Sequence, residues 1–68
     1  MTPEDWAAYV HVALDPLCDT TVSISSGLVR VDSVLDQDTA HAEVDDAKLD
    51  QRSADLCIAS IKADLGLT

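Results

Sequence analysis

Apolar residues recur at helical spacing near both ends of the chain and alternate with polar residues in its middle. The first run supplies one apolar helix face, made of Trp6, Val10, Ala13, Leu14 and Leu17. Thr2 can cap this helix, and Pro3 suits its first position. Because Pro16 disfavours helical backbone at Asp15, we predict that the helix ends near Leu14.

The middle of the chain has the pattern of a β-hairpin. Residues 21–25 and 28–32 alternate aliphatic and polar side chains on either side of Ser26-Gly27, a pair that favours a tight turn. We expect one side of this hairpin to face the core, namely Val22, Ile24, Val29 and Val31.

Residues 36–46 have a weaker pattern. Asp36-Gln37-Asp38 is typical of a turn, and Ala40, Ala42 and Val44 then lie on one side of an alternating stretch. We expect a third, edge strand here. Since alanine is a poor strand former, a loop or the start of a helix remains the alternative.

The last segment predicts a second helix, capped by Asp45 or Asp46 and running to about Leu65, with Gly66 as its stop. Its apolar residues form two stripes. The first is expected to cover the sheet and contains Ala54, Cys57, Ile58, Ile61 and Leu65. The second is surplus to that task, so either the N-terminal helix packs on it or it faces a partner chain; it contains Leu49, Leu56, Ala59 and Ala63.

Together these elements predict a single small α+β domain over residues 1–68. Its order is helix, strand, strand, third strand and helix, with both helices on one face of an antiparallel sheet. The alternative is an all-α arrangement in which residues 33–65 are helical throughout.

Composition adds that the core is thin. The chain has 68 residues and is 47% hydrophobic, yet it contains one Trp, one Tyr and no Phe. Small aliphatic side chains bury little area each, and domains of this size are marginally stable alone. Oligomerisation or docking into a larger assembly is therefore favoured.

The net charge of −9 arises from thirteen acidic and four basic residues, and much of it falls within residues 32–50. Such a chain repels nucleic acid and anionic membranes, and favours a basic partner surface. We expect an exposed acidic face made of Asp36, Asp38, Glu43, Asp45 and Asp46. The alternative is that the acidity reflects adaptation to salt or a high-GC source, with no function attached.

Metal and catalytic signatures are weak. His11, His41, Cys18 and Cys57 lack the paired spacing of a zinc site, and Asp36-x-Asp38 lacks the later ligands of a calcium loop. The sequence therefore predicts no metal, no cofactor and no catalytic residues. Both cysteines are expected to be small buried hydrophobes, although their pairing stays open.

One tetrapeptide, Asp32-Ser33-Val34-Leu35, resembles the Asp-Ser-Leu attachment site of acyl carrier proteins. The resemblance implies a phosphopantetheine on Ser33 at the start of a helix. It covers four residues, and the flanking segments depart from that family's pattern. An exposed serine at a strand end is the competing interpretation.

The pattern as a whole favours a non-enzymatic protein–protein interaction module, such as a subunit or accessory of a viral particle or another assembly. The expected interface is Leu49, Leu56, Ala59 and Ala63, with Trp6 and Tyr9 as candidate anchors. The competing interpretation of Trp6 is that it caps the core. An acidic inhibitor that mimics nucleic acid on a basic groove is the main alternative. Without a secretory signal or a long apolar run, we expect cytoplasmic synthesis and no membrane partner.

Overall fold

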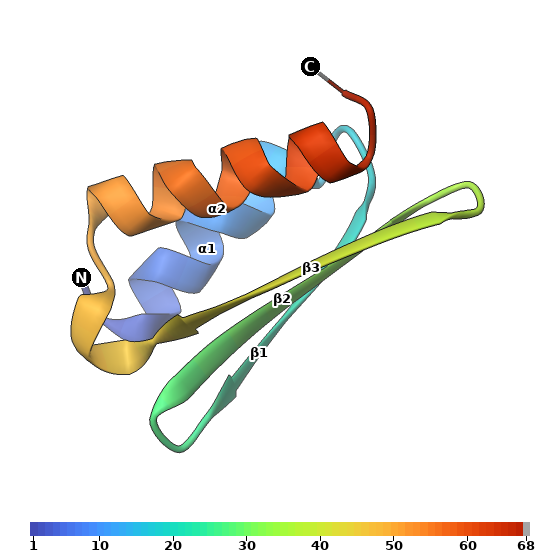
Figure 1. Ribbon diagram of the computed structural model, residues 1–68. Coiled ribbons are helices and arrows are strands. Elements are labelled where there is room, and N and C mark those ends of the chain that lie inside the picture. Colours follow the sequence, from blue (N-terminus) through green and yellow to red (C-terminus); the bar gives the residue numbers. More distant parts are fainter. Residues whose placement is uncertain (68) are drawn as a thin grey trace.

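A computed structural model describes residues 1–67 and has two helices and three strands (Figure 1). The elements are α1 (Pro3–Leu14), β1 (Asp19–Ser25), β2 (Leu28–Leu35), β3 (Asp38–Asp45), a 3₁₀ turn η1 (Asp46–Lys48) and α2 (Gln51–Asp64). The strands form one antiparallel sheet in the order β1-β2-β3. This arrangement confirms the predicted α+β class, and the all-α alternative is wrong.

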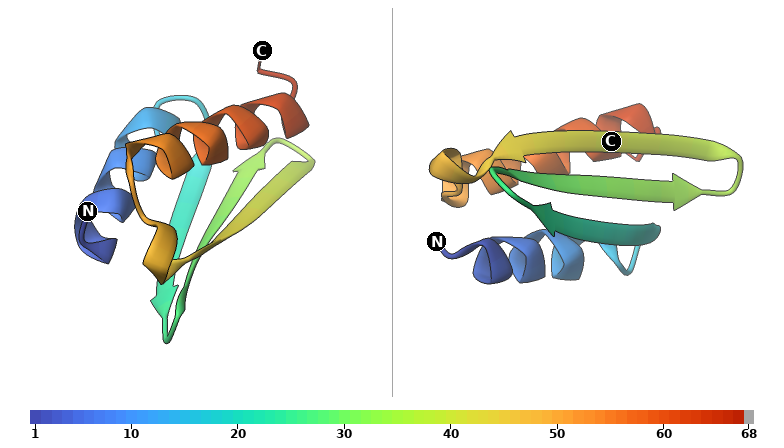
Figure 2. Two further views of the ribbon diagram at one scale, coloured as in Figure 1. Left: turned by 60° about the vertical axis from the view of Figure 1, so that its left-hand side comes forward. Right: turned by 90° about the horizontal axis from the view of Figure 1, so that it is seen from below.

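Both helices lie on the same side of the sheet. Viewed from below in Figure 2, α2 lies behind the strands, whereas α1 runs alongside β1 at the margin of the sheet. The opposite face of the sheet carries mostly exposed polar residues, among them Thr21, Ser23, Arg30, His41 and Glu43.

Helix α1 begins and ends where the sequence predicts, but the cause of its end differs from our expectation. The Thr2 hydroxyl accepts a hydrogen bond from the Asp5 backbone N–H at 3.1 Å. Asp15 remains helical, with φ −55° and ψ −42°, and its N–H donates to the carbonyl of His11. The helix stops because Pro16 has no N–H to continue the ladder, rather than because Asp15 leaves the helical region.

Two short turns set the register of the sheet. Gly27 has φ 81° in the first turn and Asp36 has φ 56° in the second, so both adopt the left-handed backbone that tight turns use. Val22 then pairs with Val31, and Val31 pairs with Ala42. The third strand is thus confirmed, with the alternation predicted from sequence.

The core lies between the sheet and the helices. The Trp6 side chain is fully buried in it, and its indole N–H donates to the Ser53 hydroxyl at 3.0 Å. The buried apolar residues are Trp6, Val10, Leu14, Cys18, Val29, Val31, Ala40, Leu49, Ala54, Cys57, Ile61 and Leu65. The predicted core stripe of α2 is therefore confirmed, apart from the half-buried Ile58.

The predicted start of the second helix is wrong. Asp50 caps α2, and its carboxylate accepts a hydrogen bond from the Ser53 N–H at 2.8 Å. The Asp50 N–H in turn donates to the Ser53 hydroxyl, which completes a capping box. Asp45 caps the 3₁₀ turn instead, by accepting from the Ala47 N–H at 3.0 Å. Leu49 consequently has extended backbone between the two helical segments.

Candidate functional site

The structure divides the apolar stripe that the sequence predicted as an interface. Leu56, Ala59 and Ala63 lie on the exposed side of α2, and the Leu56 side chain is 61% exposed. Leu49 is only 7% exposed and belongs to the core. Its assignment to the interface was wrong because it precedes α2 and does not continue the helical stripe.

The two candidate anchors on α1 also differ. Trp6 is buried against the core and Ser53, so it has no surface to offer a partner. Tyr9 is partly exposed, and its hydroxyl donates to an Asp55 carboxylate oxygen at 2.7 Å while accepting from the Gln51 amide. The hydrogen bond to Asp55 raises the pKa of Tyr9 above its ordinary value. Tyr9 thus joins α1 to α2 at the surface.

The five acidic residues predicted as one face are all exposed, but the structure does not bring them together. Asp36 and Asp38 lie at the turn between β2 and β3, where Asp38 pairs with Leu35. Asp45 pairs with Leu28 at the far end of β3, next to Asp46, and Glu43 lies two residues before it. Strand β3 has eight residues, which span about 25 Å, so the charge is divided between its two ends.

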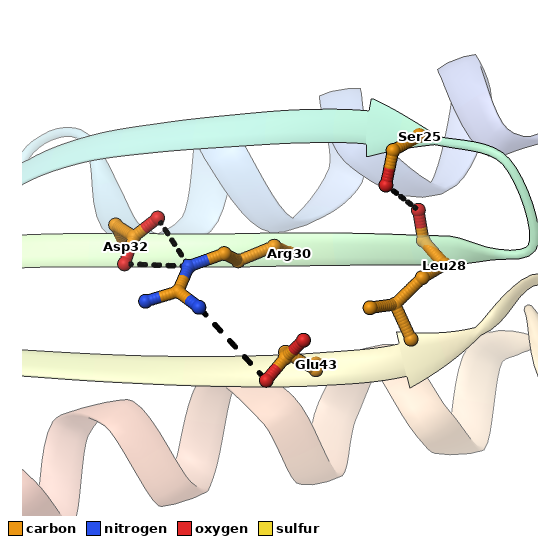
Figure 3. A network of polar contacts seen from close by, with 5 residues as sticks. All are labelled: Ser25, Leu28, Arg30, Asp32 and Glu43. Atoms are coloured by element: carbon orange, nitrogen blue, oxygen red, sulfur yellow. Dashed lines mark hydrogen bonds and ion pairs between the residues drawn. The ribbon is translucent and has the colours of Figure 1, made fainter.

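The open face of the sheet carries a small ionic cluster (Figure 3). The Arg30 Nε lies 3.0 Å from an Asp32 carboxylate oxygen, and its Nη1 lies 3.9 Å from a Glu43 oxygen on β3. The hydrogen bond to Asp32 raises the pKa of Arg30. All three side chains are about half exposed, so water screens these ion pairs and they contribute little to stability.

Ser33 does not have the setting that the acyl-carrier resemblance implies. It lies within β2, is 1% exposed, and its hydroxyl is 3.0 Å from that of Thr20 on β1. A prosthetic group attached there would have to displace the core. The expectation of an exposed strand-end serine was also wrong, because β2 extends through Leu35.

Both cysteines are buried and free, as expected for small core hydrophobes. Burial raises the pKa of the Cys57 thiol to about 11. Among residues 1–67, no three His, Cys, Asp or Glu side chains gather closely enough to hold a metal ion. Over the same range, no helix has the length and apolar character needed to cross a bilayer.

The sequence interpretation missed a surface groove between α1 and β1. It has a volume of about 470 Å³ and is lined by Ala7, Ala8, His11 and Val12 on the helix, together with residues 20–22 on the strand. Val12 is 71% exposed, more than any other large apolar side chain in the described residues. The four-residue spacing of Ala8 and Val12 was the available signal, because it marks a second apolar stripe on the first helix.

Comparison of the chain with protein-family models, with curated proteins and with solved structures finds no significant match to any of them.

Proposed function

We propose that this chain is a non-enzymatic protein–protein interaction module that serves as a subunit or accessory of a larger assembly, such as a viral particle. The observation that carries the proposal is the exposure of large aliphatic side chains, Val12 and Leu56 above all, on a strongly acidic domain. Aliphatic side chains on such a surface gain free energy when a partner removes them from water.

The exposed stripe of α2 supports the same proposal. Leu56, Ala59 and Ala63 follow one another at spacings of three and four residues, so they share one face of the helix. The two alanines are short enough to let a partner's backbone approach closely, while Leu56 offers the side chain that a partner pocket could enclose. Burial of such a stripe contributes about 25 cal/mol for each Å² of apolar surface removed from water.

The substitution Leu56→Asp tests this proposal. Leu56 makes little contact with the core, so the variant is expected to fold with an unchanged urea midpoint while its association with the assembly is lost. The chain is purified from its native source together with what binds it. The measurement is the molar mass of that complex, by light scattering after chromatography. Gln37→Asp adds the same charge at the exposed turn between β2 and β3, away from α2, and should leave association intact.

Three results would contradict the proposal. The wild-type chain could elute from native extracts at its own mass of 7.2 kDa, Gln37→Asp could disrupt association equally, or Leu56→Asp could unfold the domain. Repeating the chromatography at high salt distinguishes this proposal from the alternative, an acidic inhibitor that mimics nucleic acid. An apolar contact persists at high salt, whereas an acidic mimic dissociates as its charges are screened.

A further inference from the structure

The outer edge of β1 is unpaired within the described residues. Strand β1 pairs with β2 alone, so half of its backbone N–H and C=O groups point away from the sheet. The one charge of β1 is at its first residue, Asp19. Residues 20–25 contain no charge and no proline, the usual devices that prevent pairing at an edge. The other edge strand, β3, carries Asp38, Glu43 and Asp45.

Helix α1 overhangs this same edge. Seen from below in Figure 2, α1 runs alongside β1, on the side away from β2. The groove between the two elements is walled by Ala8, His11 and Val12 and bordered by residues 20–22. A strand added to β1 would therefore lie beneath α1, with one row of its side chains directed at Ala8 and Val12.

We propose that this groove binds an extended segment of a partner protein, which joins the sheet as a fourth strand beside β1. The inference rests on the proposed interaction function and names the partner's chemistry. Main-chain hydrogen bonds to the free edge would hold the segment, and its alternate side chains would be small and aliphatic to fit against Ala8 and Val12. Basic residues would flank that aliphatic stretch.

The charge distribution supports basic flanks. Only His11 among the groove residues can carry charge, so the interior favours an uncharged stretch. Glu4 and Asp5 precede the groove residues on α1, whereas Asp15 follows α1 and Asp19 is the first residue of β1. These exposed carboxylates attract Lys or Arg on either side of the bound segment, as does the net charge of −9.

A second copy of this chain fits the groove less well. If two copies paired through β1 about a two-fold axis, their two α1 helices would occupy the same space, because each helix overhangs the edge of its own sheet. The two copies would also each carry a charge of −9. A separate extended segment of opposite charge avoids both conflicts.

The test is a titration of the full ¹⁵N-labelled chain, followed by amide chemical shifts, with the blocked peptide Lys-Lys-Val-Thr-Val-Thr-Val-Lys-Lys. We expect saturable shifts in β1 and α1, and slower hydrogen exchange at the outward amides of β1, below about 1 mM peptide. A peptide N-methylated along its central residues cannot pair with an edge and should not bind. A peptide with Glu in place of Lys should bind at least tenfold more weakly.

Matched substitutions locate the site. Val12→Glu adds a charge within the groove and should weaken peptide binding at least tenfold, whereas Leu56→Glu adds the same charge on α2 and should not. The inference is overturned if no shifts appear, if they fall on β3 or α2, or if the N-methylated peptide binds equally. Concentration-dependent shifts of β1 without peptide would assign the edge to a second copy and also overturn it. Each of these results leaves the size of the native assembly, which tests the proposed function, unaffected.

Discussion

The Ser53 hydroxyl joins two helices and a helix cap. It accepts hydrogen bonds from the Trp6 indole N–H at 3.0 Å and from the Asp50 backbone N–H at 3.1 Å. It also lies 3.0 Å from the Asp50 carbonyl, to which it donates. The Ser53 side chain therefore accepts from the indole N–H, the only polar group in the buried Trp6 side chain, and also fixes the start of α2.

Replacing Ser53 with Ala should lower the free energy of unfolding by about 2 kcal/mol, because it removes a cap partner and leaves the buried indole N–H unpaired. Urea denaturation followed by Trp6 fluorescence measures the loss. Ser60→Ala, at an exposed position of the same helix, is the control and should change stability by less than about 0.5 kcal/mol. Equal effects of the two substitutions would refute the role assigned to Ser53.

The Cys57 thiol gives a second prediction at this scale. Its pKa is raised from 9.0 to about 11 by burial, so its thiolate at pH 8 should be about a hundredfold scarcer than that of an ordinary thiol. In a Cys18→Ser variant, labelling by a disulfide reagent should be slow in the folded protein and fast in urea. Since the folded state holds the proton more tightly, stability should fall as pH rises from about 9 to 11. Fast labelling of folded protein at pH 8 would contradict this.

At the scale of elements, Asp50 differs from the acidic residues before it because its side chain caps α2. The hydrogen bond from the Ser53 backbone lowers the pKa of Asp50. We expect Asp50→Ala to reduce the urea midpoint and Asp46→Ala to leave it nearly unchanged. Because the folded state favours the Asp50 carboxylate, the gap between wild type and Asp50→Ala should shrink as pH falls below about 4. If Asp46→Ala lowered the urea midpoint more than Asp50→Ala, Asp46 would be the cap of the second helix, as the sequence predicted.

The same region shows how far sequence reasoning reached. The bounds of α1 and the presence of the first hairpin and of the third strand follow from local caps, alternation and turn residues, all of which act within a few positions. The hairpin strands are longer than the predicted residues 21–25 and 28–32, because β1 begins at Asp19 and β2 continues to Leu35. The segment from Asp45 to Asp50 offers three aspartates that could each cap a helix, and Leu49 fits the helical period of the residues after it. The capping box with Ser53 and the burial of Leu49 together select Asp50. The first is local and the second is a tertiary effect.

The candidate sites were less predictable because the exposure of an apolar residue depends on tertiary packing. Trp6, Leu49 and Leu56 are all large apolar residues with helical neighbours, and local pattern cannot say which of them the other helix covers. The groove depends on where α1 lies relative to the edge of β1. No local signal encodes that relation, although the stripe formed by Ala8 and Val12 shows that α1 has a second apolar side.

At the scale of the whole molecule, the repulsion between like charges opposes the compact fold. The domain measures 31 × 20 × 16 Å and carries a net charge of −9. At about 10 mM salt the Debye length is about 30 Å, so the carboxylates repel one another across the whole domain. We expect the urea midpoint to rise as NaCl increases from about 10 to 200 mM. The double variant Asp36→Asn, Asp38→Asn should show a smaller rise, and a midpoint that falls with salt would disprove the argument.

The position of α1 beside β1 also bears on aggregation. An uncharged sheet edge normally invites copy after copy to stack into a cross-β fibre. Here a helix stands over that edge, and each incoming copy would bring its own helix into the same space. The opposite edge is guarded by Asp38, Glu43 and Asp45. On the proposal above, the position of α1 would admit a foreign strand at this edge and hinder a second copy of the domain from pairing there.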